Sequence, residues 1–134
     1  MRGTKPQLFE DDSPMEEFVP APEWLSDDAR KEWDRVLPVL LERRILTDAD
    51  LGSLENYCAA IGQVREAQRE INKRGILIST ARGSKKNPAV TVQSDAMTRA
   101  RLLAAELGLT PVSRSRPAVR GSSGGEGDDP LNLS

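Results

Sequence analysis

The sequence contains no histidine, a single cysteine and only five aromatic residues among its 134. Histidine is the commonest general base and metal ligand, so its absence argues against most hydrolytic and metal sites. Cys58 alone can form neither an intrachain disulfide nor a cysteine-cluster zinc site. Five aromatic side chains are too few for a large core around a deep cavity. We therefore expect a non-enzymatic protein that holds no metal and no other cofactor.

Long apolar runs are also missing, because the longest, residues 57–61, comprises five residues. A transmembrane helix needs about 20 predominantly apolar residues, so we expect no membrane span. No apolar segment follows Met1 and Arg2, and we expect no signal peptide either. Together these features predict a cytosolic protein.

The formal net charge of −2 conceals a separation of charge along the chain. Residues 1–24 carry −4, residues 25–75 carry −1, residues 76–120 carry +6 and residues 121–134 carry −3. The +6 block holds eight bases and two acids, a pattern typical of a surface that contacts a polyanion. The alternative is that these lysines and arginines only keep the surface soluble.

Proline, glycine and apolar periodicity divide the chain into three parts. Residues 1–23 hold four prolines among acidic residues, which predicts an extended or disordered N-terminal arm. Residues 113–134 are rich in Ser, Gly, Arg and Asp, which predicts a flexible C-terminal tail. Residues 24–112 are expected to form the ordered, helical domain of the chain.

A first helix is predicted to begin at Ser26, because apolar residues follow it at three- and four-residue spacings. The Ser26 hydroxyl can cap the free N–H groups, and the two aspartates after it suit the positive end of the helix. Pro38 falls inside the pattern, so we expect the helix to kink or restart there. Trp24 and Trp33 are expected to be core anchors rather than base-stacking surfaces.

A much longer second helix is predicted from Thr47, a capping residue, to a stop at Gly75. Its roughly 27 residues would span about 40 Å at ~1.5 Å per residue. The apolar stripe repeats nearly every seven residues, which indicates packing along another helix or a neighbouring subunit. Cys58 falls in this stripe and is expected to be a buried small hydrophobe. The core or subunit-contact residues that we predict are Trp24, Trp33, Leu54, Tyr57, Ile61, Val64 and Ile71.

Residues 76–93 change to a β-type pattern. Ile76–Ile78 and Ala89–Val92 are apolar and rich in β-branched residues, and a basic stretch separates them. The pattern predicts a hairpin or long loop with a basic tip. A third helix is expected from a cap at Ser94 to a stop at Gly108. The predicted fold class is mainly α, with three principal helices and a short hairpin or loop between the second and third.

The basic residues of the +6 block are candidates for contacts with DNA phosphates. Such cations give affinity but little sequence readout. The sequence contains no phosphate-binding loop of the Gly-x-x-x-x-Gly-Lys type, and its helical aspartate pairs follow cap residues, where acids are structurally expected. The candidate DNA-binding residues are Arg82, Lys85, Lys86, Arg99, Arg101, Arg114, Arg116 and Arg120.

Several short motifs follow one another in a definite order over residues 2–116. They are Gly3-Thr4-Lys5-Pro6, Pro22-Glu23-Trp24-Leu25, Ile45-Leu46-Thr47-x-x-Asp50, Tyr57-Cys58, Asn87-Pro88 and Leu107-Gly108-Leu109-Thr110-Pro111. No single motif is specific, but the ordered set resembles the small terminase subunits of tailed bacteriophages, in the branch known from lambdoid siphophages. Relatives often carry another basic residue in place of Thr4, and this departure weakens the case for an N-terminal DNA-binding arm.

This resemblance implies a non-catalytic component of the genome-packaging motor in the cytoplasm of the infected host cell. It implies a homo-oligomeric ring that recognises double-stranded viral DNA and delivers it to the large terminase subunit, which carries the ATPase and nuclease. It also implies that the ring modulates those activities. A ring would suit a chain whose own hydrophobic core is small, because the second helix can bury part of its apolar stripe against neighbouring subunits.

Two alternatives stay open at this point. One is an oligomeric adaptor that holds the large subunit without contacting DNA, with the acidic residues 126–134 as its docking peptide. The other is a small dimeric DNA-binding regulator. The mass of the protein in solution separates the regulator from the ring.

Overall fold

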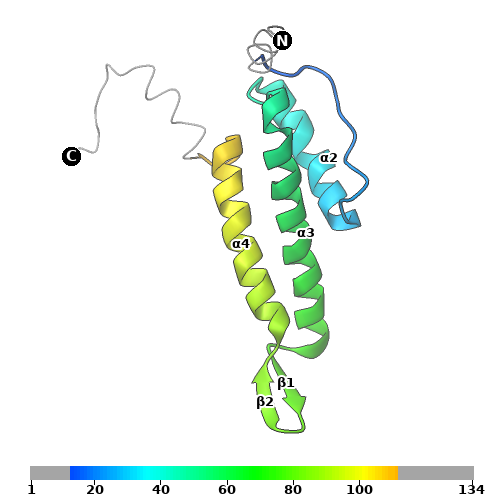
Figure 1. Cartoon of the computed structure of the whole chain (residues 1–134), viewed down its shortest axis with the longest axis vertical. Coiled ribbons are helices and arrows are strands. Elements are labelled where there is room, and N and C mark those ends of the chain that lie inside the picture. The colour runs from blue at the N-terminus through cyan, green and yellow to red at the C-terminus, as the bar shows by residue number, and fades with distance from the viewer. Residues whose placement is uncertain (1–12, 112–134) are drawn as a thin grey trace, which may run out of the picture.

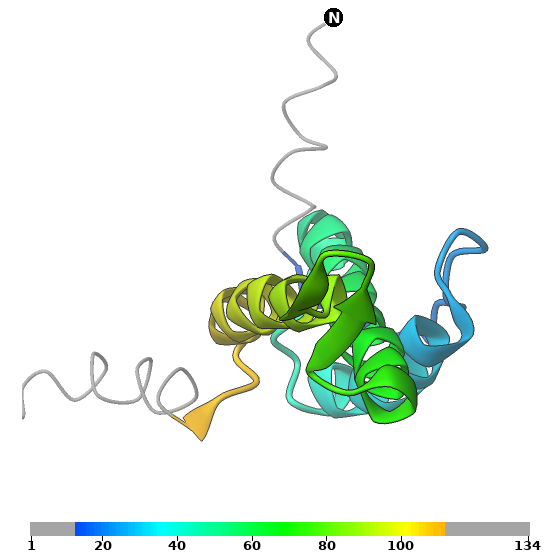
Figure 2. The ribbon, with the colours of Figure 1, turned by 90° about the horizontal axis from the view of Figure 1, so that it is seen from below.

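The computed structural model describes residues 13–111, which form an elongated and mainly helical molecule (Figure 1). Its helix α3 lies between helices α2 and α4, and a two-stranded hairpin projects beyond the ends of α3 and α4 (Figures 1 and 2). The predicted fold class, with three helices and a hairpin between the second and third, is therefore confirmed. The elements are α2 (Asp27–Glu42), the short 3-10 helix η1 (Asp48–Asp50), α3 (Leu51–Arg74), β1 (Leu77–Thr80), β2 (Gly83–Lys86) and α4 (Pro88–Leu107).

The segment before α2 runs alongside that helix and is tied by hydrogen bonds to the helix and to the connection that follows it (Figure 1). The backbone N–H of Met15 donates to the carbonyl of Leu46 at 2.8 Å. The indole N–H of Trp33 donates to the carbonyl of Val19, also at 2.8 Å. The described part of the predicted arm is thus held against α2, while residues 1–12 and the predicted tail over 113–134 lie outside the described residues.

Helix α2 begins where its sequence predicts. The Ser26 hydroxyl accepts a hydrogen bond from the N–H of Ala29 at 3.2 Å, and acidic residues occupy the first turn. The helix continues through Pro38 as far as Glu42, so it does not restart at the proline. The Pro38 ring is exposed, where it disturbs no packing against α3. The kink at Pro38 stays a prediction.

The main core lies between α2 and α3. Trp33, Leu37 and Leu40 of α2 are almost fully buried, and they share one cluster with Leu54 and Cys58 of α3. The two helices approach closely near Gly62. An added Cβ at this position would lie 2.8 Å from the Ser26 hydroxyl oxygen.

Helix α4 packs on the other side of α3 through small side chains. Its buried residues are Ala96, Ala100, Ala104 and Leu107. On α3, Ala60 and Ala67 are buried and line the same helix pair. Alanine faces allow a close approach of two helices but bury little apolar area.

The predicted core residues differ in their burial. Tyr57 is buried like Trp33 and Leu54, whereas Ile61, Val64 and Ile71 are half-buried. The expectation of Trp24 in the core of the single chain is wrong, because its side chain is 59% exposed. The Trp24 indole lies on the surface and donates to Glu55 Oε1 at 3.3 Å.

The second strand and the start of the third helix also differ from the prediction. Ala89–Val92 form the first turns of α4 instead of a strand, and β1 pairs with Gly83–Lys86. Asn87 caps the helix by accepting from the N–H of Ala89 at 3.0 Å, and Pro88 occupies the first helical position. A cap followed by proline is a strong helix start, and it outweighs the β preference of the residues that follow. Ser94 is therefore interior to α4 and not its cap.

Candidate nucleic-acid interface

The hairpin turn places Arg82 at the tip of the projecting element. Ala81 and Arg82 connect the two strands. The Thr80 hydroxyl donates to the carbonyl of Gly83 at 2.7 Å and accepts from the N–H of Arg82 at 3.2 Å. Gly83 has a φ of +108°, a conformation that residues with a side chain rarely adopt. The turn is therefore well defined, and its hydroxyl bonds fix the backbone from which Arg82 extends.

The register of the hairpin places its two lysines on different faces. Leu77 lies opposite Lys86, and Ile78 lies opposite Lys85. Successive side chains of a strand point to opposite faces, so Lys85 and Lys86 flank the hairpin on its two sides. All of β2 is exposed. The three hairpin cations, Arg82, Lys85 and Lys86, thus extend from the tip and from both faces.

These hairpin cations form no ion pair within residues 13–111. The ion pairs found there engage arginines on the helices and in the α2–η1 connection. Exposed cations without an internal carboxylate partner are free to contact an external anion at little cost in lost interactions. The arginines that are paired are Arg35, Arg44, Arg65, Arg69 and Arg74.

The other predicted cations do not join the hairpin in one patch. Arg99 lies about 16 Å along α4 from Pro88, at ~1.5 Å per residue. It donates to Gln63 Oε1 at 2.5 Å. Arg101 is turned by about 200° from Arg99 around the helix, so the two point to nearly opposite sides. Arg114, Arg116 and Arg120 lie outside the described residues.

Neighbouring hollows between α3 and α4, together called the α3–α4 groove, were not predicted from the sequence. Their volumes are about 520 and 350 Å³, and Gln63 lines both of them. Trp24, Leu102 and Val92 line the groove and are about half exposed. The sequence feature that could have indicated this groove is the pair Leu102 and Leu103. Adjacent leucines on one helix cannot both face α3, so one of them must lie on the surface.

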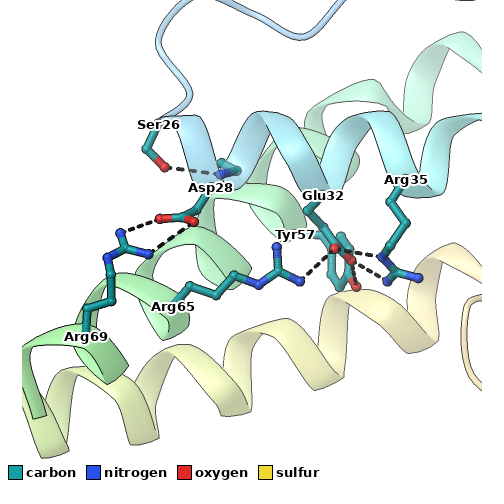
Figure 3. A network of polar contacts seen from close by, with 8 residues as sticks. Ser26, Asp28, Glu32, Arg35, Tyr57, Arg65 and Arg69 are labelled. Atoms are coloured by element: carbon teal, nitrogen blue, oxygen red, sulfur yellow. Dashed lines mark hydrogen bonds and ion pairs between the residues drawn. The ribbon is translucent and has the colours of Figure 1, made fainter. Parts of the chain in front are cut away.

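A buried carboxylate joins α2 to α3 (Figure 3). Glu32 is 1% exposed and accepts hydrogen bonds from Arg35 at 2.6 and 3.0 Å. It also accepts from the Tyr57 hydroxyl at 2.6 Å and from Arg65 at 3.2 Å. A second ion pair, Asp28 with Arg69, lies one turn away along α2. In the sequence, Glu32 stands out as a charged residue within the apolar stripe of α2. The sequence does not reveal its partners on α3.

The ionisation of this cluster follows from its contacts. Burial alone would raise the pKa of Glu32, but the hydrogen bonds from Arg35 and Tyr57 outweigh it, and the pKa is lowered. Burial and the bond to Glu32 raise the pKa of Tyr57 above its ordinary range. Burial also raises the pKa of Cys58 to about 12. The cluster therefore holds α2 on α3, and Cys58 stays a neutral thiol.

Residues 13–111 contain neither a metal-binding cluster nor a membrane-spanning helix. No group of three or more Cys, Asp or Glu side chains is placed to hold a metal ion there. No helix in this part of the chain is long and apolar enough to cross a membrane.

Fold and site together define a small, elongated helical protein with a cationic hairpin at one end. A family model described as phage terminase, small subunit, matches residues 29–123. The chain therefore belongs to the phage terminase small subunit family and has a role in phage DNA packaging. Members of this family are generally non-catalytic. Comparisons with curated proteins and with solved structures found no match. The lambdoid branch stays a prediction.

Proposed function

We propose that this protein is a ring-forming, DNA-binding small terminase subunit. It recognises double-stranded viral DNA and delivers it to the large terminase subunit, whose ATPase and nuclease it modulates, in the cytoplasm of the infected host cell. The observation that carries the proposal is the projecting hairpin, whose three cations form no ion pair within residues 13–111. Membership of the family gives the context for this surface.

Assembly into a ring would strengthen a contact that is weak in a single chain. Phosphate contacts from lysine and arginine provide sequence-independent affinity that falls with salt concentration. Many copies of one cationic hairpin raise the effective concentration of each contact after the first. This multiplication suits a protein that must stay on DNA until the large subunit engages it.

The distribution of exposed apolar side chains supports a head-to-tail assembly. One apolar surface is the α3–α4 groove, with Leu102 at 53% exposure. The segment that lies alongside α2, across the molecule from α4, carries an exposed apolar side chain, Phe18, which is 57% exposed (Figures 1 and 2). An interface between two different surfaces of one chain repeats in the same direction and can close into a ring. We propose that the groove receives the α2 side of a neighbouring copy.

The DNA contact is tested by replacing the hairpin lysines, Lys85→Glu and Lys86→Glu, singly and together, and measuring duplex binding at several salt concentrations. Affinity should fall, and the slope of log affinity against log salt should flatten by about 1 for each lysine lost. Lys31→Glu, on the exposed surface of α2, is the charge-matched control for each single substitution. Binding that is unchanged at every salt concentration removes the hairpin from the DNA contact and favours the adaptor.

The assembly is tested by native mass spectrometry of the purified full-length chain at micromolar concentration. We expect one closed oligomer, and Leu102→Gln should shift it towards smaller species. Ala105→Gln changes an exposed position of the same helix to the same residue and serves as the control. A monomeric or dimeric wild type contradicts the ring.

A further inference from the structure

The hairpin has the dimensions of a protein ribbon that fits the major groove of DNA. Its four-residue strands are about 13 Å long at ~3.4 Å per residue. The major groove is about 12 Å wide and about 8.5 Å deep and admits a two-stranded ribbon, whereas the minor groove is only about 6 Å wide. Because the hairpin projects beyond the helices, it can enter a groove of the DNA before α3 and α4 meet the phosphate backbone (Figure 1).

The placement of charge on the hairpin indicates a groove rather than a flat surface. A hairpin that lay flat on one row of phosphates would need cations on one face only. Lys85 and Lys86 extend from opposite faces, and a groove presents a wall of phosphates to each face. The chain carries no acid between Glu70 and Asp95, so no carboxylate of the hairpin opposes either wall.

The tip of the hairpin is narrow and carries one long side chain. Arg82 is flanked by Ala81 and Gly83, which leave the tip slim enough to approach the floor of a groove. The Thr80 hydroxyl holds the N–H of Arg82 and the carbonyl of Gly83, so the arginine starts from a fixed backbone. An arginine at the groove floor can donate to O6 and N7 of one guanine, the commonest specific contact of this kind.

We propose that the hairpin enters the major groove of duplex DNA, where Arg82 reads a guanine edge and the two lysines hold the phosphate walls. This inference rests on the proposed DNA binding and adds to it a groove, an orientation and a specificity-determining residue. Base reading is thereby assigned to Arg82 and phosphate binding to Lys85 and Lys86, although the three cations lie within five positions of one another in the sequence. A bidentate arginine contact of this kind gives about a 5- to 150-fold preference for the right base.

The first experiment separates base reading from phosphate binding, with the full-length protein and a pool of random-sequence duplexes. Wild type should enrich a site with a fixed guanine, and Arg82→Ala should lose the preference at that position. Affinity of Arg82→Ala for unselected duplex should stay within about threefold, since the base contact is absent there. Lys85→Ala and Lys86→Ala should keep the enriched sequence, while each lowers affinity for all duplexes and reduces the salt slope by about 1. Lys31→Ala is the control, and Arg82→Lys tests the need for the guanidinium fork.

The second experiment identifies the groove. In duplexes whose cytosines carry glucosylated 5-hydroxymethyl groups, the sugar fills the major groove and leaves the phosphates and the minor groove in place. Binding to this DNA should fall at least tenfold, and netropsin, which occupies the minor groove, should not displace the protein. Equal binding to glucosylated and plain duplex, displacement by netropsin, or retention of the fixed guanine by Arg82→Ala would each overturn the inference.

These outcomes are distinguishable from failure of the proposed function. A wild type that binds plain duplex without base preference, and binds glucosylated duplex equally well, keeps its DNA-binding role and loses only the groove and the reading residue. A wild type that binds no duplex under any salt condition contradicts both.

Discussion

Removal of the Glu32 carboxylate should destabilise the protein more than removal of any exposed acid on α2. In Glu32→Ala, the Tyr57 hydroxyl loses its acceptor inside the core, and two arginines lose a buried partner. Breaking a buried ion pair costs about 3–5 kcal/mol when the remaining charge stays buried. Arg35 is 66% exposed and Arg65 is 42% exposed, so water can solvate both, and we expect a smaller loss of about 2–3 kcal/mol. Glu32→Gln keeps an acceptor for Tyr57 and should cost about 1–2 kcal/mol.

Urea denaturation at a fixed protomer concentration measures this loss, because assembly makes apparent stability depend on concentration. Helical circular dichroism reports the unfolding of α2, α3 and α4 together. Asp34→Asn, an exposed acid on the same helix, is the control and should change the free energy of unfolding by less than about 0.5 kcal/mol. A loss for Glu32→Ala as small as that of the control would refute the assignment of Glu32 as the link between α2 and α3.

The same residue gives a pH dependence with a defined sign. The pKa of Glu32 is lower in the folded chain than in the unfolded chain. Its contribution is therefore complete above the unfolded value of about 4.3 and is lost as pH falls through the folded value. Asp28, whose pKa is lowered by Arg69, acts in the same direction, so the difference between wild type and Glu32→Gln isolates Glu32. This difference should shrink below pH 4, and a constant difference down to pH 2 contradicts the reasoning.

Three further predictions follow from the packing. Gly62→Ala should destabilise by about 1–3 kcal/mol, since its Cβ would meet Ser26 at 2.8 Å, whereas Gly52→Ala meets nothing within 4 Å and should stabilise by up to about 1 kcal/mol; thermal melts of the two variants compare them directly. Asn87→Ala removes the cap of α4 and a side-chain bond to the carbonyl of Gly75, so it should cost about 1–2 kcal/mol and speed hydrogen exchange in the hairpin; unchanged exchange speaks against a role in anchoring it. Cys58 should resist a thiol reagent at pH 8 in the native protein and react in denaturant, because it is buried with its pKa raised to about 12; fast native labelling would contradict its burial.

One helix start and two helix stops were predictable, because their signals are local, whereas Thr47 caps the 3-10 helix η1 and α3 begins only at Leu51. Ser26, Gly75 and Gly108 act at the positions that their chemistry predicts. The second strand was not predictable, because the β-type pattern of Ala89–Val92 conflicts with the helix start at Asn87 and Pro88. In that conflict the cap and the proline decided the outcome.

The candidate site was predictable only where its residues are neighbours in the sequence. The hairpin cations lie within five positions of one another and stay together in space. Arg99 and Arg101 are also close in sequence, but the helical repeat points them apart. Two of the three partners of Glu32, Tyr57 and Arg65, come from α3, 25 and 33 residues away, a distance over which local periodicity carries no information.

The alanine face of α4 has a mechanical consequence. Ala96, Ala100 and Ala104 repeat every fourth residue, so a shift of α4 by four residues, about 6 Å along its axis, would bring one alanine into the place of the next. Such a regular alanine face resists separation of α4 from α3 much better than it resists sliding of α4 along α3. The position along α3 is held instead by polar bonds, one from Arg99 to Gln63 and two nearer the hairpin, from Asn87 to Gly75, at 2.9 Å, and from Gln93 to Gln68, at 2.7 Å. The last two lie in the half of α4 next to the hairpin, so a pull on the hairpin along the helix axis would load them first.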